Sequence, residues 1–312
     1  MGKGSDCAER NPGYQTGEWS SLHEMRSLRR LFVFPILLAL AAVLAACGER
    51  HGGDVVRIGV NDLALPHWNV LKKKAAAQGI TIEYVNFSDY NQPNPALSQG
   101  RIDLNKFQHV RYLANYNARN NDTLVPIAAT EIFPLALYSK KHRSVAEIPQ
   151  GGQITLSNNP ANQVRPLLSL AAAGLVALKG GPSWDSKLTD VDTAASKVRL
   201  TTIDPTLTAQ SLDSVDAAFV DDTFAQPAGL TQQQVILTDD PQRPELKQYI
   251  NIFAARAKDK DDPRLLAVTK LYHDPEVEAA VRAESGFDGI FKTNDAADLQ
   301  ATLAELEAKF RR

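Results

Sequence analysis

Two polar side chains stand at the start of an apolar helix pattern in the segment 157-SNNPANQVRPLLSL-170. Pro160 opens the pattern, and Asn162 and Arg165 are three residues apart, so they share one face of its first turn. A helix N-terminus presents bare N–H groups and the positive end of a dipole, to which an amide and a guanidinium add donors. Together these groups suit a small anion such as a carboxylate. The alternative is a solvated arginine on a helix that a preceding asparagine caps.

Strand and helix patterns alternate after residue 54, which predicts an α/β fold with mainly parallel sheets. The first series has strands at 55–60, 80–87, 101–107 and 124–129 and helices at 66–78, 93–100 and 109–120. The second series has strands at 153–156, 198–203, 216–220 and 234–237 and helices at 160–174, 205–212 and 221–228. Helices at 263–272, 275–283 and 295–311 complete the chain.

Two longer extended runs, 131–141 and 248–256, separate the two series. We interpret them as crossings between two lobes, of which lobe 1 comprises 55–134 plus 252–312 and lobe 2 comprises 135–251. A cleft between two lobes is a favoured place for a small ligand, and a hinge of a few residues permits closure around it.

The N-terminal region contains the segment 25-MRSLRRLFVFPILLALAAVLAACGER-50. Three arginines precede an apolar run of 16 residues, Leu31–Ala46, which is shorter than the roughly 20 residues of a membrane span. This pattern indicates a signal peptide, and its end, Leu44-Ala45-Ala46-Cys47, resembles the bacterial lipobox. We therefore expect residues 1–46 to be an N-terminal extension with a lipoprotein signal peptide, Cys47 to be acylated and 47–54 to be a linker. The alternative is an ordinary apolar segment with a chance cysteine.

Composition excludes several classes of protein. The formal net charge is −2 and the charged residues, 22% of the chain, are interspersed without a basic stripe, so we expect no nucleic-acid partner. Only Cys7 and Cys47 are present, and Cys7 precedes the signal peptide, so no disulfide is expected.

Several motifs occur together in order over residues 44–290. They are LAAC at 44–47, 89-DYNQPNPAL-97, 103-DLNKFQHVRYL-113, 136-ALYSKK-141, 158-NNPANQVR-165, 216-DAAFVDDTFA-225 and 249-YIN-251. In these motifs the chain resembles the NLPA lipoprotein family, the methionine-binding lipoproteins of bacterial ABC importers. The resemblance implies a two-lobed periplasmic-binding-protein fold that closes on one free amino acid, most simply L- or D-methionine, without catalysis or a cofactor. It implies an ABC permease and its ATPase as partners, and a lipid anchor in the cell envelope that faces the periplasm or the exterior.

The resemblance also implies site residues. The family's aromatic box corresponds to Tyr90, Phe107, His109 and Tyr112, and its contacts to the substrate carboxylate correspond to Asn162 and Arg165. Arg165 has the geometry for a bidentate, charge-assisted pair, and a thioether gains modestly from contact with aromatic rings. Two alternatives remain open: Phe107 can pack in the core, and His109 can cap a helix or lie on the surface.

The chain departs from the family at Asp221, where most members have asparagine, and at Phe224, where they have tyrosine. Asp221 either pairs with the ligand's ammonium more strongly than an amide would, or the site is adapted to a different ligand, one with added positive charge or a polar side chain. The segment 295–311 lies outside the resemblance.

Other classes of protein find little support. There is no GxSxG motif and no free cysteine beside a histidine, and the six histidines are scattered, so neither a hydrolase nor a metal site is expected. A binding lipoprotein for a different small amino-acid-like ligand is the main alternative. A periplasmic enzyme or an adhesion lipoprotein on the same fold are further alternatives.

Overall fold

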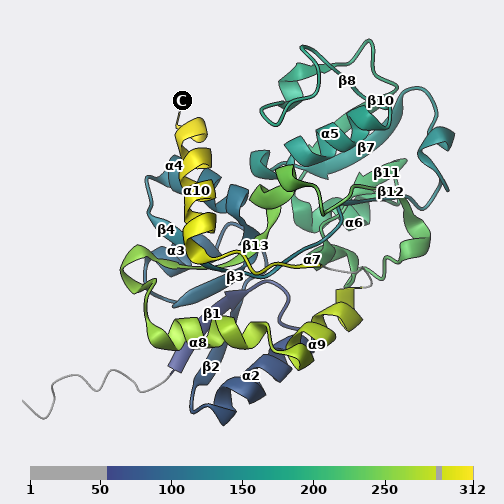
Figure 1. Ribbon diagram of the computed structural model, residues 1–312. Helices are drawn as coiled ribbons and strands as arrows, with labels where there is room; N and C mark the ends of the chain where they lie inside the picture. The colour runs from purple at the N-terminus through teal and green to yellow at the C-terminus, as the bar shows by residue number, and fades with distance from the viewer. Residues whose placement is uncertain (1–54, 286–289, 312) are drawn as a thin grey trace, which may run out of the picture. The chain divides into compact units, whose positions relative to one another are not determined.

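The computed structural model describes residues 55–285 and 290–311 (Figure 1). The extension, the signal peptide, Cys47 and the linker lie outside the described residues. Within the described ranges, no helix is long and apolar enough to cross a membrane.

The first sheet has the strand order β2-β1-β3-β13-β4. Its strands are β1 (Val55–Val60), β2 (Thr81–Asn86), β3 (Leu104–His109), β4 (Leu124–Ala129) and β13 (Asn251–Arg256). The helices around it are α2 (His67–Ala77), α3 (Pro93–Ser98), α4 (Val110–Asn120), α8 (Pro263–Tyr272), α9 (Pro275–Ser285) and α10 (Ala296–Phe310). β1 pairs in parallel with β2 and β3, whereas β13 runs antiparallel to both β3 and β4.

The second sheet has the strand order β10-β7-β11-β6-β12. Its strands are β6 (Ala136–Tyr138), β7 (Gly152–Ser157), β10 (Val198–Ile203), β11 (Ala217–Phe219) and β12 (Val235–Thr238), and its helices are α5 (Val164–Ala172), α6 (Thr208–Ser211) and α7 (Asp222–Ala225). β7 pairs in parallel with β10 and β11, whereas β6 runs antiparallel to β11 and β12. A small hairpin that the sequence patterns did not indicate, β8 (Ala177–Leu178) with β9 (Val191–Asp192), extends this part.

The fold is α/β and two-lobed, as predicted. We call the part built on the first sheet the first lobe and the part built on the second sheet the second lobe. The antiparallel strand in each sheet, β6 or β13, is the first strand of its own sheet that the chain forms after it leaves the other sheet. Before β6 the chain forms β5 (Glu131–Ile132), which pairs with β14 (Ile290–Phe291). Before β13 it forms a 3-10 helix, η6 (Pro244–Tyr249).

Helices cover both faces of the first sheet, so its buried strands are apolar on both sides. On one face β1 packs with α2, α8 and α9, and the side chains there include Ile58, Trp68, Leu71, Phe253 and Tyr272. On the other face are α3, α4 and α10, with Leu97, Leu113, Leu299, Leu303 and Leu306. The C-terminal helix α10 thus belongs to the core of the first lobe and lies along α4 (Figure 1).

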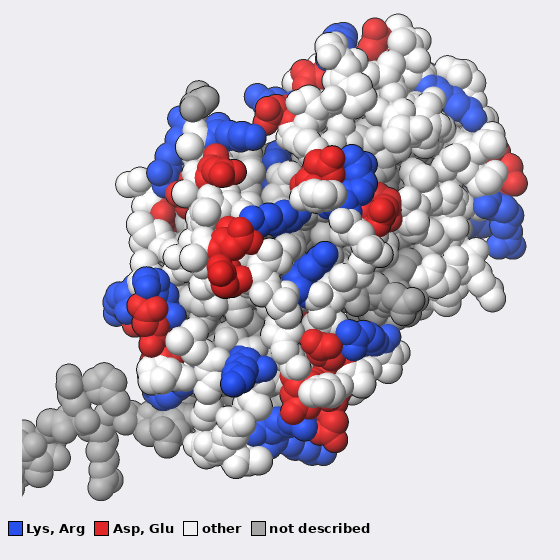
Figure 2. Space-filling model, viewed as in Figure 1, with Lys and Arg blue, Asp and Glu red and all other residues white. Residues whose placement is uncertain are grey.

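The second lobe follows the same plan. Alternate residues of its strands enter two clusters: Leu137, Ile154 and Phe219 pack with α5, and Tyr138, Ala218 and Val220 pack with α6 and α7. On the face shown in Figure 2, basic and acidic side chains are interspersed among uncharged ones.

Several predicted elements differ from the structure in their bounds, among them the helix predicted at 221–228, which is only α7, and three differences have a local reason. The strand predicted at 101–107 is β3, which begins at Leu104 because Gly100 (φ 73°) ends the preceding helix in a turn. The helix predicted at 160–174 opens as a 3-10 turn, Pro160–Asn162, where Asn159 accepts the N–H of Ala161, and α5 begins only at Val164. The extended run predicted at 248–256 starts inside η6, whose first residue is Pro244.

Candidate ligand-binding site

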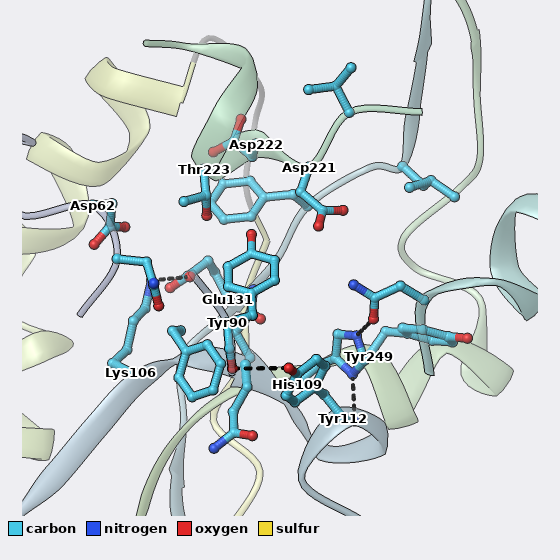
Figure 3. A pocket seen from close by; sticks show the side chains of 18 of the residues that line it. Asp62, Tyr90, Lys106, His109, Tyr112, Glu131, Asp221, Asp222, Thr223 and Tyr249 are labelled. Carbon is cyan, nitrogen blue, oxygen red and sulfur yellow. Dashed lines mark hydrogen bonds and ion pairs between the residues drawn. The ribbon is translucent and has the colours of Figure 1, made fainter. Parts of the chain in front are cut away.

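A cavity of about 150 Å³ is lined by residues that follow the carboxyl ends of strands from both sheets. The first lobe supplies Asn61 and Asp62 after β1, Phe107 and His109 at the end of β3, and Glu131 after β4. The second lobe supplies Asn162 and Arg165 after β7, and Asp221 and Asp222 after β11. In α/β folds this edge of a sheet is the usual place for ligand-binding residues. Figure 3 shows the cavity from close by.

Three aromatic side chains, Tyr90, Phe107 and Tyr112, line one wall of the cavity, and Phe224 packs against Tyr90. The ring of Tyr90 lies 5.9 Å from that of Phe107 and 5.1 Å from that of Phe224, and Phe107 lies 5.6 Å from Tyr112. The hydroxyl of Tyr112 donates to the carbonyl of Tyr90 at 3.0 Å, which fixes the two tyrosines relative to each other. Phe107 is half-buried and lines the cavity, and Phe224 is part of the same aromatic cluster.

His109 joins the two lobes and caps a helix. It is the N-cap residue of α4, where its Nδ1 accepts the backbone N–H of Tyr112 at 3.0 Å. Because Nδ1 is an acceptor, Nε2 carries the hydrogen and donates to Oδ1 of Asn162 at 3.1 Å. Burial lowers the pKa of His109 to about 3, against the effect of its hydrogen bond to Asn162, so the ring is neutral near pH 7. The amide nitrogen of Asn162 then remains a donor for a ligand.

Arg165 lines the cavity, and a carboxylate of the chain itself holds its bidentate edge. Nε and Nη2 donate to Asp239 at 2.6 and 2.8 Å, and Nη2 also donates to the carbonyl of Phe133 at 2.9 Å. The guanidinium lies 5.3 Å from the ring centroid of Tyr249. Three of its five N–H groups are thus engaged, and Nη1 remains the part that can meet a ligand carboxylate.

Asp221 lies at the N-cap position of α7, but its side chain accepts no capping hydrogen bond. Burial raises the pKa of Asp221 to about 6, against the charge of Arg165 and a hydrogen bond from Tyr90. A carboxylate whose pKa is raised by burial gains from a nearby cation. This is the property that an α-ammonium group requires of its partner.

Four further charged residues line the cavity that the sequence patterns did not single out: Asp62, Lys106, Glu131 and Asp222. Nζ of Lys106 lies 2.8 Å from Oε1 of Glu131, and both side chains are buried. The signal in the sequence was a charge next to the end of an apolar strand, as at Glu131 after 124-LVPIAA-129. Within the described ranges, no group of three or more His, Cys, Asp or Glu residues is placed to hold a metal ion.

Known proteins share this sequence and architecture. The NlpA lipoprotein family matches residues 56–292. The probable D-methionine-binding lipoprotein MetQ of Haemophilus influenzae is 33% identical over 260 residues, which cover 80% of this chain and 93% of that protein.

Two solved structures share the fold. The substrate-binding protein of a methionine transporter from Streptococcus pneumoniae is 31% identical, with a TM-score of 0.70, and the match covers 76% of this chain and 95% of that one. A nutrient-binding protein from Burkholderia cenocepacia, bound to methionine, is 30% identical with a TM-score of 0.70, and the match covers 76% and 99%. From the aromatic wall, the paired arginine and the extent of these matches, it follows that the chain belongs to the NlpA lipoprotein family.

Proposed function

We propose that this protein is the substrate-binding lipoprotein of an ABC-type importer, that it binds one free amino acid between its lobes and that it delivers the amino acid to a permease driven by an ATPase. Methionine is the amino acid that its relatives' names specify. In this proposal the amino acid binds reversibly, and neither a chemical step nor a cofactor is involved. The hinge boundaries that we propose lie at 134/135 and 251/252.

The observation that carries this proposal is the pairing of opposite groups in one closed cavity. Nη1 of Arg165 and the amide of Asn162 suit the α-carboxylate, and Asp221 suits the α-ammonium. Between and beside them, the rings of Tyr90, Phe107 and Tyr112 offer an apolar wall for a side chain, with Phe224 packed in the same aromatic cluster. A zwitterion satisfies both polar sets at once, which a simple anion or a simple cation does not.

The lipid anchor is the second part of the proposal. We propose acylation of Cys47, with the lobes held at a membrane of the cell envelope through the linker 47–54. The lipobox-like sequence before Cys47 and membership of a lipoprotein family support it.

Wild-type protein and the variant Cys47→Ala test both parts. Wild type should fractionate with membranes and Cys47→Ala should not, and calorimetric titration should show both binding methionine with equal affinity, because the substitution leaves every named residue of the cavity unchanged. Mass spectrometry should recover the bound amino acid unchanged. Membrane retention of Cys47→Ala contradicts the anchor, absence of amino-acid binding contradicts the transport role, and a new mass contradicts binding without chemistry.

A further inference from the structure

The cavity extends past the aromatic wall to a second end that is rich in carboxylates. Asp62 and Glu131 of the first lobe and Asp222 of the second lobe line it, together with Asn61 and Lys106. In Figure 3, Asp62 and Lys106 lie on one side of Tyr90, and His109 and Tyr249 lie on the other. A ligand held at Arg165 therefore directs its side chain, past Tyr90, toward these carboxylates.

The charge of Lys106 is already matched. Its ammonium lies 2.8 Å from Oε1 of Glu131, whose Oε2 accepts the hydroxyl of Tyr272 at 3.0 Å. It also lies 5.8 and 5.5 Å from the ring centroids of Trp68 and Tyr272. This buried pair is neutral as a unit, so the negative charge of Asp62 and Asp222 remains.

Asp62 belongs to the first lobe and Asp222 to the second, and neither carboxylate has a cationic ion-pair partner among the described residues. Asp62 accepts a hydrogen bond from Nε1 of Trp68 at 2.8 Å. Burial raises the pKa of Asp222 to about 7, aided by the charges of Glu131, Asp62 and Asp221 and opposed by the charge of Lys106. Like charges are thus held near one another in a site with reduced access to water, which is unfavourable unless a cation lies between them.

A second, independent feature of this end is a buried hydrogen-bond acceptor that lacks a donor. The side chain of Asn61 donates through Nδ2 to the carbonyls of Phe87 and Asp89, both at 2.9 Å. These bonds fix the amide, and its Oδ1 is buried with no hydrogen-bond partner among the described residues. A buried acceptor without a donor is unfavourable in the empty site and is satisfied when a ligand brings an N–H group.

We infer, on the basis of the proposed function, that the cavity accepts an amino acid whose side chain ends in a primary ammonium, and that it places this group among Asp62, Asp222 and Asn61. An ammonium has three N–H donors, which matches two carboxylates and one amide oxygen. These side chains are not placed as a metal site within the described ranges, so an organic cation is the chemistry they suit. The apolar wall remains available to methionine, and the ammonium adds contacts that methionine lacks.

Lysine and norleucine measure this inference directly, because norleucine is lysine without its side-chain ammonium. The full-length chain, in detergent and freed of bound ligand by dialysis from denaturant, is titrated calorimetrically with lysine, norleucine and methionine at pH 7.5. Wild type should bind lysine at least about tenfold more tightly than norleucine. Asp222→Asn should remove most of that difference and leave norleucine and methionine within about threefold of wild type. Asp185→Asn, an exposed carboxylate that does not line the cavity, is the matched control and should change nothing.

Proton release gives a second measurement. At pH 6.5 the binding of lysine should release up to about one proton more than the binding of norleucine, and Asp222→Asn should abolish the excess. Titrations in buffers of different ionisation enthalpy report the number of protons. Lysine that binds no more tightly than norleucine, while methionine binds, overturns the inference and leaves the proposed function intact. Equal loss for all three ligands in Asp222→Asn overturns it too, because the residue is then structural. Failure of wild type to bind any amino acid overturns the proposed function itself.

Discussion

Two buried ion pairs border the cavity, one at each end. The groups that remain available to a ligand have opposite charge at the two ends. At one end, Asp239 engages Nε and Nη2 of Arg165, and the unused Nη1 keeps this end a donor of hydrogen bonds and positive charge. At the other end, Glu131 forms an ion pair with Lys106, and the carboxylates without a cationic partner are those of Asp62 and Asp222. The cavity is therefore polarised along its length. In the proposed function, this polarity orients a zwitterion with its carboxylate toward Arg165.

The two pairs also differ in their role. The Arg165 pair lies on the second lobe, with Asp239 just after β12, and orients a guanidinium toward the ligand. The Lys106 pair lies within the first lobe, between β3 and β5, against Trp68 and Tyr272. We therefore expect the first pair to govern binding and the second to govern stability.

The largest effect should come from breaking the buried pair of the first lobe. Lys106→Met leaves the fully buried Glu131 without a cation, which should lower the free energy of unfolding by about 3–5 kcal/mol. Denaturant titration measures it. The double variant Lys106→Met with Glu131→Gln should recover most of the loss. Single and double variants of equal stability would show that the pair contributes little and that the comparison is wrong.

Arg165→Ala should have the next largest effect, and on binding. It leaves the ligand carboxylate unpaired in a closed site, so affinity for methionine should fall by about 2–5 kcal/mol, or roughly 30-fold and more. Arg165→Lys should recover only part, because it lacks the fork that Asp239 holds.

Asp239→Asn is the matched control for Arg165. It keeps the guanidinium but weakens its support, and its loss of affinity should be smaller than that of Arg165→Ala. Calorimetry gives the affinities, and thermal melting verifies that each variant is folded. If folded Arg165→Ala binds methionine with unchanged affinity, Arg165 does not contact the ligand and serves only as the ion-pair partner of Asp239.

The pH dependence of stability separates the two carboxylates of α7. The pKa of Asp222 is about 7 and that of Asp221 about 6, both above the ordinary 3.8 of the unfolded chain. Between about pH 4 and 7 the folded protein therefore binds more protons than the unfolded one, and stability falls as pH rises. His109 acts in the opposite sense, because its pKa is lowered to about 3, so each variant must be compared with wild type.

Without ligand, wild type should lose on the order of 2–4 kcal/mol more stability across this range than Asp222→Asn loses. The corresponding difference between wild type and Asp221→Asn should be smaller. Denaturant titrations at pH 4, 5.5 and 7.5 measure the difference. Parallel curves for wild type and Asp222→Asn would mean that Asp222 is not desolvated, which would remove the contrast between the two ends.

Local patterns predicted much of the fold because each pattern depends only on the residues of one segment of the chain. β1 and β4 begin and end where their apolar runs do, and α8 ends at Tyr272 as its pattern predicted. Prediction was poorer where a side chain bonds its own backbone, as at Asn159, since that choice competes locally with the helix. The extended runs gave candidate crossings whose bounds stay a prediction, but they did not indicate the antiparallel direction of β6 and β13, which depends on pairing with distant strands.

The candidate site was predicted in part for the same reason. Tyr90, Phe107, His109 and Tyr112 lie in motifs, and the structure brings them together with Asn162, Arg165 and Asp221 around one cavity. Their role in binding a ligand remains a prediction. Of the alternatives for His109, the helix cap is confirmed, because Nδ1 caps α4, while Nε2 reaches Asn162 and the place of His109 in a ligand-binding aromatic box stays a prediction.

The sequence by itself determined the alternation of strands and helices, the division of the chain by two crossings and the residues that carry the family resemblance, because each depends on neighbours a few positions apart. Only the tertiary structure decided which charges meet. Asp239 is 74 residues from Arg165, Glu131 is 25 residues from Lys106, and Asp62 and Asp222 come from different lobes. Electrostatic energy depends on distance and burial in space, and no local pattern reports either of these. The polarity of the cavity, and with it the orientation that we propose for the ligand, is therefore a property of the folded chain.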